Sequence, residues 1–342
     1  MNTPMSETGT KPAGHPGDTG SDPAGEQARE RLAAVRAEVA KAVVGQDAAV
    51  SGLLVALLCG GHVLMEGVPG VAKTLLVRSL AGALSVDTRR VQFTPDLMPG
   101  DITGSMVIDS SRGELSFREG PLFTNLLLAD EINRTPPKTQ AALLEAMEER
   151  QVTIEGQARP LPDPFIVLAT QNPIEYEGTY PLPEAQLDRF LVRVAFGYPD
   201  ADGEWEVLNR RMTRRHEDQQ VRRVVDAAEL LDMQAAMEDV TVSPELGRYC
   251  VALTRATRDH EHSLMGASPR GSLALMLVGR AYAVIRGRDY VTPDDVKAIA
   301  PAVLEHRVVV RPELWMSDVS ARSIVADLLR TVPTPRTAVR TS

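Results

Sequence analysis

Two hydrophobic periodicities alternate along the chain. Helical spacing comes first, in two segments that begin at Glu26 and end at about Leu58, with a short break at Val44, Gly45 and Gln46. Apolar runs the length of a buried strand then recur at residues 62–65, 90–93, 126–129, 165–170 and 191–195. Helix-like segments at 75–84 and 140–150 lie between them. Strands alternating with helices predict an α/β fold, with a parallel sheet covered by helices on both faces.

Two stretches depart from this alternation. Residues 107–117 are centred on Ser-Ser-Arg-Gly, residues 151–162 are centred on Glu-Gly, and both predict hairpins. Beyond Gly197 the pattern is helical, and we expect no further strand pairs. Helix starts there are marked by a hydroxyl residue followed by proline, at Ser243, Ser268 and Thr292. The α/β core is therefore predicted to be followed by a small all-helical domain.

These changes of pattern divide the 342 residues into five segments. Residues 1–25 contain almost no large apolar side chain and are expected to be a disordered N-terminal tail. The predicted α/β core follows at 26–200, then a linker helix at 201–222, the helical domain at 223–330 and a C-terminal tail at 331–342. No segment has the length and apolarity of a membrane span, and the N-terminus lacks the pattern of a secretory signal.

The charge and the rarer side chains narrow the possible chemistry. A formal net charge of −9 provides no global attraction to nucleic acid or anionic membrane. Cys59 and Cys250 are far apart and predict buried, reduced thiols, which suits the cytoplasm. His260 and His262 are expected to face divergent directions on the surface, so no zinc site is predicted.

The stretch between the first predicted strand and its helix has the spacing of a phosphate-binding loop. Its residues are Gly67, Val68, Pro69, Gly70, Val71, Ala72, Lys73 and Thr74. Glycines let backbone N–H groups turn toward a phosphate, and the following helix N-terminus adds a favourable field. Lys73 is expected to reach the β- and γ-phosphate oxygens, and Thr74 to give its hydroxyl to Mg²⁺.

Ala72 stands where glycine usually precedes the lysine. If this position needs a positive φ, alanine costs about 1–2 kcal/mol there. If it lies in the right-handed region, the cost is small and Ala72→Gly should scarcely alter ATP affinity. Only the backbone conformation decides between these two expectations.

Polar side chains follow the later strands. Asp130 and Glu131 end the run at 126–129, where Asp130 can order the water shell of Mg²⁺ and Glu131 can polarise an attacking water. Asn172 follows the next run and can hold that water and sense the γ-phosphate. Arg189 precedes the last run. Arg270 lies in the first turn of a helix, where the dipole disfavours a cation, so it should have an anionic partner, for which the γ-phosphate is the candidate.

Taken together, these motifs resemble those of the AAA+ ATPases, and within them the MoxR family, over about residues 26–330. The segments that carry the resemblance are 66–74 (EGVPGVAKT), 128–134 (LADEINR), 169–173, 182–190 and 268–270. The resemblance implies that Asn172 is the first sensor, Arg270 the second sensor on a helical lid, and Arg189 the arginine finger that reaches a neighbouring subunit. Arg134 is an alternative finger.

The same resemblance gives a role to the segments outside the phosphate site. Val44, Gly45 and Gln46 resemble the segment that lies near the adenine. The two hairpins resemble the insertions of the helix-two-insert branch, which point toward the pore of a ring. ATP and Mg²⁺ are the implied substrate and cofactor, and the implied assembly is a closed homo-oligomeric ring, expected to be a hexamer.

The implied function is chaperone-like, ATP-driven remodelling of a protein client, often with a von Willebrand factor A domain partner in metal-centre or complex maturation. A nucleic-acid-stimulated motor is one alternative, supported by the arginines at 210, 211, 214, 215, 222 and 223. A magnesium-chelatase-like ATPase subunit is another. A scaffold that binds nucleotide without hydrolysing it has no use for Glu131, so we expect an enzyme.

Overall fold

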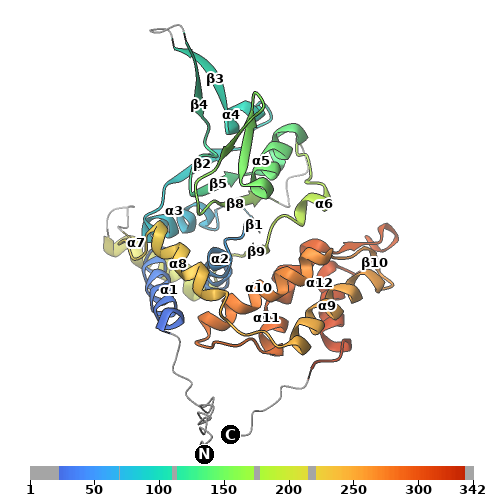
Figure 1. Cartoon of the computed structure of the whole chain (residues 1–342). Helices are drawn as coiled ribbons and strands as arrows, with labels where there is room; N and C mark the ends of the chain where they lie inside the picture. Colours follow the sequence, from blue (N-terminus) through green and yellow to red (C-terminus); the bar gives the residue numbers. More distant parts are fainter. Residues whose placement is uncertain (1–22, 69, 110–113, 173–177, 215–220, 336–342) are drawn as a thin grey trace, which may run out of the picture.

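The computed structural model describes residues 23–68, 70–109, 114–172, 178–214 and 221–335. Pro69 of the phosphate loop, the centre of the first hairpin, Pro173, Arg215, residues 1–22 of the N-terminal tail and residues 336–342 of the C-terminal tail lie outside the described residues. Figure 1 shows a sheet-containing core, with one hairpin rising at the top, above a separate group of helices at the lower right.

Five parallel strands form the central sheet in the order β2-β5-β8-β1-β9. Their bounds are β1 Val63–Gly67, β2 Thr88–Gln92, β5 Leu126–Asp130, β8 Ile166–Gln171 and β9 Val192–Phe196. The three central strands β5, β8 and β1 have almost all of their side chains buried, because helices cover both faces of the sheet there. The predicted parallel α/β sheet is confirmed.

The strand β2 corrects one expectation. Residues 90–93 were expected to be buried, but β2 is an edge strand whose side chains are half-buried or exposed. It has a partner on one side only and carries Arg89 and Arg90. Only Phe93, just beyond the strand, is fully buried.

Helices cover both faces of this sheet, as the nearly continuous apolar strands require. Successive residues of β5 serve different cores: Leu126 and Leu128 pack in one cluster, Leu127 and Ala129 in the other. The first cluster includes α1 Pro23–Ala42, α2 Asp47–Leu58 and α3 Lys73–Leu84. The second includes α5 Pro137–Glu149, with the short elements α4 Pro99–Thr103, η1 Ile132–Arg134 and α6 Glu184–Leu187 near it.

Both hairpins that interrupt the alternation are confirmed. Strands β3 Gly104–Asp109 and β4 Glu114–Glu119 form the projecting ribbon at the top of Figure 1. Strands β6 Gln151–Ile154 and β7 Gln157–Pro160 form the second, beside α5. Arg159 of the second hairpin stacks over the ring of Phe117 of the first, 4.2 Å from its centroid, so the two insertions contact each other.

After the sheet, α7 Ala201–Arg214 leads to the helical domain. Its helices are α8 Ala227–Met237, α9 Pro244–Asp259, α10 Pro269–Ile285, α11 Pro293–Leu304 and α12 Ala321–Thr331, with η2 Glu305–Arg307 and η3 Pro312–Leu314. Ser243, Ser268 and Thr292 each cap the helix that the sequence predicted. A correction concerns strands: β10 Ser263–Met265 pairs with β11 Val309–Val310, although no strand pair was expected. Strands this short show no alternation that a sequence pattern could reveal.

The histidine expectation is wrong for one residue. His260 follows α9 instead of lying on it, and its side chain is only 12% exposed. Its ring meets that of His262 edge to face, with centroids 5.2 Å apart. Among the described residues no group of three metal-ligating side chains is present. Cys59 and Cys250 are unpaired, and burial raises the pKa of both, that of Cys250 to about 11. None of the described helices is long and apolar enough to cross a membrane.

Candidate functional site

The phosphate loop joins β1 to α3 at the carboxyl edge of the sheet. A Cβ on Gly67 would lie 2.6 Å from the carbonyl oxygen of Phe196, so only glycine lets β1 approach β9 this closely. Gly70 has a φ of 82°, with open space around it. Lys73 Nζ donates to the carbonyl oxygen of Gly67 at 2.7 Å. Thr74 lies in the first turn of α3. The loop thus folds back on itself through the hydrogen bond from Lys73 and leads directly into the N-terminus of α3.

Ala72 is the N-cap residue of α3, with φ 63° and ψ 21°. This is the left-handed region, so the first of the two expectations applies. The backbone conformation costs an L-residue about 1–2 kcal/mol, which glycine would avoid. The loop carries this strain at the point where the chain turns into α3.

Asp130 and Glu131 lie at the end of β5, as predicted. Thr170, on the neighbouring strand β8, donates its hydroxyl to Asp130 Oδ1 at 2.6 Å and accepts the N–H of Glu131 at 2.8 Å. Arg90 Nη2 lies 2.7 Å from Asp130 Oδ2, and Gln92 Nε2 donates to Glu131 Oε2 at 2.7 Å. Both carboxylates are therefore held in place by side chains of the two strands that flank β5.

Asn172 comes immediately after β8, which pairs with β5 in parallel. Its side chain is buried at the same edge as Asp130. Gln171, the last residue of β8, donates to Glu66 Oε1 on β1 at 2.6 Å and so joins these strands at their carboxyl ends. The predicted first sensor, the two carboxylates and the phosphate loop thus share one edge of the sheet.

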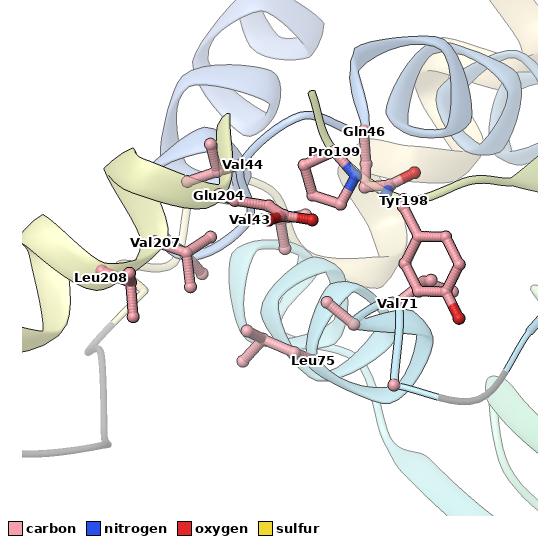
Figure 2. Close-up of a pocket in the computed structure, with 13 residues that line it drawn as sticks. Val43, Val44, Gln46, Val71, Leu75, Tyr198, Pro199, Glu204, Val207 and Leu208 are labelled. Atoms are coloured by element: carbon pink, nitrogen blue, oxygen red, sulfur yellow. The ribbon is translucent and has the colours of Figure 1, made fainter. Parts of the chain in front are cut away.

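A cavity of about 400 Å³ lies beside the phosphate loop, between α3 and α7 (Figure 2). The predicted segment takes part: Val44 and Gln46 line the cavity, and Gly45 lies against Pro199. Gln46 Nε2 donates to the carbonyl oxygen of Gly197 at 2.9 Å, which holds the segment against the end of β9. The remaining walls are mostly aliphatic and come from the loop, α3 and α7. They are Ala42, Val43, Gly70, Val71, Ala72, Leu75, Tyr198, Pro199, Glu204, Val207 and Leu208.

Sequence reasoning did not find the α7 side of this cavity. Val207, Leu208 and the carboxylate of Glu204 face Val71 and Leu75 across it (Figure 2). The available signal was the apolar pair Val207 and Leu208 in a mostly polar helix. In the structure both side chains are exposed, 47% for Val207 and 58% for Leu208. Apolar side chains left uncovered beside a mostly aliphatic hollow are what a flat, aromatic base would cover.

Arg189 and Arg270 meet at one carboxylate, that of Glu148 in the last turn of α5. Arg189 Nη2 lies 2.8 Å from Glu148 Oε2, and Arg270 donates to Glu148 Oε1. The hydrogen bond from Arg270, together with the charges of Arg189 and Arg270, holds the pKa of Glu148 below its usual value. Arg270 therefore has the anionic partner that its helix position required, and in this chain it is a carboxylate.

This arginine pair lies at the amino edge of the sheet, opposite the phosphate loop. Arg150, the residue after α5, donates to the carbonyl oxygens of Gly60 at 2.6 Å and Phe165 at 2.5 Å. Gly60 and Phe165 precede β1 and β8, so the end of α5 lies at the amino edge. Arg189 itself precedes β9. Arg134, by contrast, lies at the carboxyl edge with its Nε 3.1 Å from Glu131 Oε2. The structure brings Arg189 and Arg270 together but does not bring either to the phosphate loop of the same chain.

Comparisons with known proteins agree with this architecture. Residues 62–192 match the ATPase family associated with various cellular activities (AAA), and residues 255–328 match the AAA lid domain. A crystal structure of a candidate ATPase from Cytophaga hutchinsonii is 42% identical, with a TM-score of 0.85 over 92% of this chain and 97% of the other.

Three curated relatives match along most of their length. The uncharacterized protein YeaC of Bacillus subtilis is 47% identical over 84% of this chain and 90% of its own length. Chaperone MoxR1 of Mycobacterium tuberculosis is 44% identical over 87% and 81% of the two chains. Protein MoxR of Methylorubrum extorquens is 32% identical over 90% and 96%. With the sheet order, the helical lid and the phosphate loop already in place, these similarities show that the chain belongs to the MoxR family of AAA+ ATPases.

Proposed function

We propose that this protein hydrolyses ATP with Mg²⁺ in a closed ring whose active sites lie between neighbouring subunits. The observation that carries the proposal is the separation of the arginines from the phosphate loop. Arg189 and Arg270 bind Glu148 at one edge of the sheet, while Lys73, Asp130 and Glu131 lie at the other. A single chain therefore holds two half-sites at opposite edges of its sheet, which a second copy would bring together.

The residues of the carboxyl edge fit a nucleotide and a hard divalent cation. The cradle from Gly67 to Thr74 would hold the phosphates, and the aliphatic cavity with Val44, Gly45 and Gln46 would hold the adenine. Thr74 and, through water, Asp130 would hold Mg²⁺, since hydroxyl and carboxylate oxygens are its preferred ligands. When bound, the ion neutralises charge that develops on the phosphates.

Around that cradle the chain's own side chains divide the chemistry. Glu131 polarises the attacking water, and Asn172 orients it against the γ-phosphate. Thr170 is a positioning residue, because its hydroxyl bonds the side chain of Asp130 and accepts the N–H of Glu131. Arg189 from the neighbouring subunit would stabilise the transition-state charge, which is worth about 10³ to 10⁵ in rate for such a finger. Arg270 of the same neighbouring subunit would enter the site beside Arg189.

We further propose a chaperone-like role, in which the ring remodels a protein client in the cytoplasm, with a von Willebrand factor A domain protein as partner. The name of the relative Chaperone MoxR1 supports a protein client, because chaperones act on proteins. So does the projecting hairpin, which exposes Ile108 and Leu115 opposite each other in register. Exposed apolar side chains on a protruding ribbon suit contact with a polypeptide. A hexamer is the proposed ring size.

Three of the six arginines that favoured a nucleic-acid motor form ion pairs within the chain. Arg210 Nε lies 2.6 Å from Glu206, Arg222 Nη2 lies 3.1 Å from Glu38, and Arg223 Nη2 lies 2.7 Å from Asp226. Arginines already paired with carboxylates are poor phosphate ligands, because each new contact must first break an ion pair. No described feature therefore favours the motor over the remodeller.

The ring proposal is tested by mixing two inactive variants. Lys73→Ala lacks the phosphate lysine but keeps its arginines, and Arg189→Ala lacks the finger but keeps its phosphate loop. Co-assembled, the two should recover ATP turnover, because each Arg189→Ala site can receive Arg189 from a Lys73→Ala neighbour. In addition, turnover per chain of the unaltered protein should rise with protein concentration. Turnover by a monomer that is independent of concentration would contradict the proposal.

The client proposal is tested with Glu131→Gln as a trap. This variant should retain ATP and the closed ring without turnover, so proteins that stay bound in ATP and leave in ADP are the clients. Recovery of DNA alone, with ATPase stimulation that fades with salt, would replace the remodeller by the nucleic-acid motor.

A further inference from the structure

Arg307 is a buried arginine of the lid whose guanidinium is directed into the core. It ends η2, directly after α11, and is only 6% exposed. Its Nε donates to Asp188 Oδ1 at 2.7 Å. Its Nη2 donates to the carbonyl oxygens of Phe190 at 2.7 Å and Asp188 at 3.2 Å, and its Nη1 to that of Leu191 at 3.2 Å. One lid side chain thus binds four acceptors of the core segment 188–191.

The same segment carries Arg189. The carboxylate of Asp188, in this segment, binds two elements of the lid. Oδ1 accepts from Arg307, and Oδ2 accepts the hydroxyl of Ser268 at 2.6 Å. Ser268 is the N-cap of α10, and its Oγ accepts the N–H of Arg270 at 3.0 Å. Asp188 therefore links the two arginines. It directly precedes Arg189, and it binds Ser268, the helix cap two residues before Arg270.

Burying a guanidinium is costly unless its charge is paired and its donors are satisfied. Arg307 meets both conditions, but mostly with partners from the other domain. Within the lid, the carbonyl oxygen of Val303 accepts from its Nη1, and His306 Nε2 lies 2.7 Å from that nitrogen. The burial lowers the pKa of Arg307, and the charge of Asp188 opposes that change. Such a group holds its partners in one arrangement, because any shift leaves buried donors unpaired.

We propose that Arg307 is a positioning residue that sets Arg189 and Arg270 together for delivery to a neighbouring subunit. Through Asp188 it ties the segment before β9 to the start of α10, so the finger and the second sensor move as one unit with the lid. The inference rests on the proposed function, because the two arginines act in another chain's site. It predicts that loss of Arg307 impairs the neighbour's turnover and leaves the chain's own ATP binding intact.

The test uses Arg307→Lys in the full chain, which keeps the positive charge but cannot reach all four acceptors at once. Turnover should fall about 10-fold to 100-fold, because misplacing a catalytic group by about 1 Å costs on the order of 10². The dissociation constant for a fluorescent ATP analogue should stay within about twofold, because the phosphate loop lies at the opposite edge. Arg311→Lys is the matched control, since Arg311 donates to Glu261 within the lid, and its turnover should stay unchanged.

Co-assembly with Lys73→Ala separates a positioning role from a structural one. If Arg307 positions the arginines, sites of Arg307→Lys subunits are served by intact arginines of Lys73→Ala neighbours, and turnover recovers as it does for Arg189→Ala. If Arg307 only supports its own nucleotide site, the mixture stays inactive while the Arg189→Ala mixture recovers, and the inference is wrong. If neither mixture recovers, the ring proposal itself fails and the inference fails with it.

Asp188→Asn provides a second route should Arg307→Lys not fold. It keeps the shape of the side chain and its acceptor oxygen but removes the charge that pairs with Arg307. We expect a smaller loss of turnover, about 5-fold to 20-fold for one weakened charged hydrogen bond, with the same rescue by Lys73→Ala. Unchanged turnover in both variants, with native melting temperatures, would overturn the inference.

Discussion

The two edges of one parallel sheet carry opposite chemistry. At the carboxyl edge, backbone N–H groups and Lys73 are arranged for an anion, and Asp130 and Glu131 for a cation and a water. At the amino edge, Arg189 and Arg270 are bound by Glu148. The first edge carries the phosphate loop but neither Arg189 nor Arg270. The second carries both of these arginines but no phosphate loop. Under the proposed function this difference makes a pair of subunits the unit of catalysis, so changes at the two edges should have different kinetic signatures.

The largest expected effect is at the amino edge. Arg189→Ala should lower turnover about 10³-fold or more, within the range for an arginine finger, while ATP affinity stays near that of the unaltered protein. Arg134→Ala, at the carboxyl edge, serves as the comparison and should cost less than about 10-fold, the effect of disturbing the side chain of Glu131 rather than removing a finger. Steady-state turnover and analogue binding measure both. A reversed order would make Arg134 the finger.

At the carboxyl edge, Glu131→Gln should lower turnover about 10²-fold to 10⁴-fold, the contribution of a general base. ATP affinity should be retained, because the new glutamine side chain has the shape of the glutamate it replaces. Its amide oxygen can still accept the hydrogen bond from Gln92. Glu149→Gln, an exposed carboxyl at the end of α5, is the control and should change nothing. Unchanged turnover in Glu131→Gln would refute its assignment as the base.

Acid should destabilise the folded protein through two buried histidines at the amino edge and the lid junction. Buried His62 accepts the N–H of Val167 and contacts the carbonyl oxygen of Met147; burial and the charge of Arg150 lower its pKa to about 3. His306 at the lid junction is likewise buried, next to Arg307, with a lowered pKa. Below pH about 6.5 the unfolded chain binds protons on both histidines that the folded chain does not. The unfolding free energy should therefore fall by about 1.4 kcal/mol per pH unit for each histidine.

Urea unfolding between pH 7 and pH 4 measures this slope. His62→Gln should reduce the slope by about 1.4 kcal/mol per pH unit, whereas His262→Gln, whose ring is more exposed, should leave it as it is. A slope that His62→Gln does not change would show that other groups account for the acid sensitivity.

The smallest effect is expected at Ala72. Relief of its left-handed conformation is worth about 1–2 kcal/mol, and the extra freedom of glycine in the unfolded chain offsets about half of that. Ala72→Gly should therefore raise the unfolding free energy by about 0.5–1 kcal/mol. Ala81→Gly, inside the same helix α3, should lower it by about 1 kcal/mol. Equal effects at the two positions would mean that Ala72 is not strained.

The parts of the site that the sequence predicted are those carried by short, contiguous patterns. The loop from Gly67 to Thr74 follows a strand and opens a helix, and Asp130 ends an apolar strand, so both could be placed before the fold was known. Glu148 and Thr170 could not. Each is an ordinary helix or strand residue whose role comes from partners far away in the chain, as Glu148 meets Arg270 across 122 positions.

The sequence by itself therefore determined the local elements, the phosphate loop and the family, because each depends on side chains a few positions apart. Only the tertiary structure decided that Ala72 takes a positive φ, that β2 is an exposed edge, and that Arg189 and Arg270 lie opposite the phosphate loop. Those features depend on which strands become neighbours and on where a lid returns to its core. Arg307 is the clearest example, since its four acceptors lie 116 to 119 positions earlier in the chain. They satisfy its buried charge only when both domains are folded together.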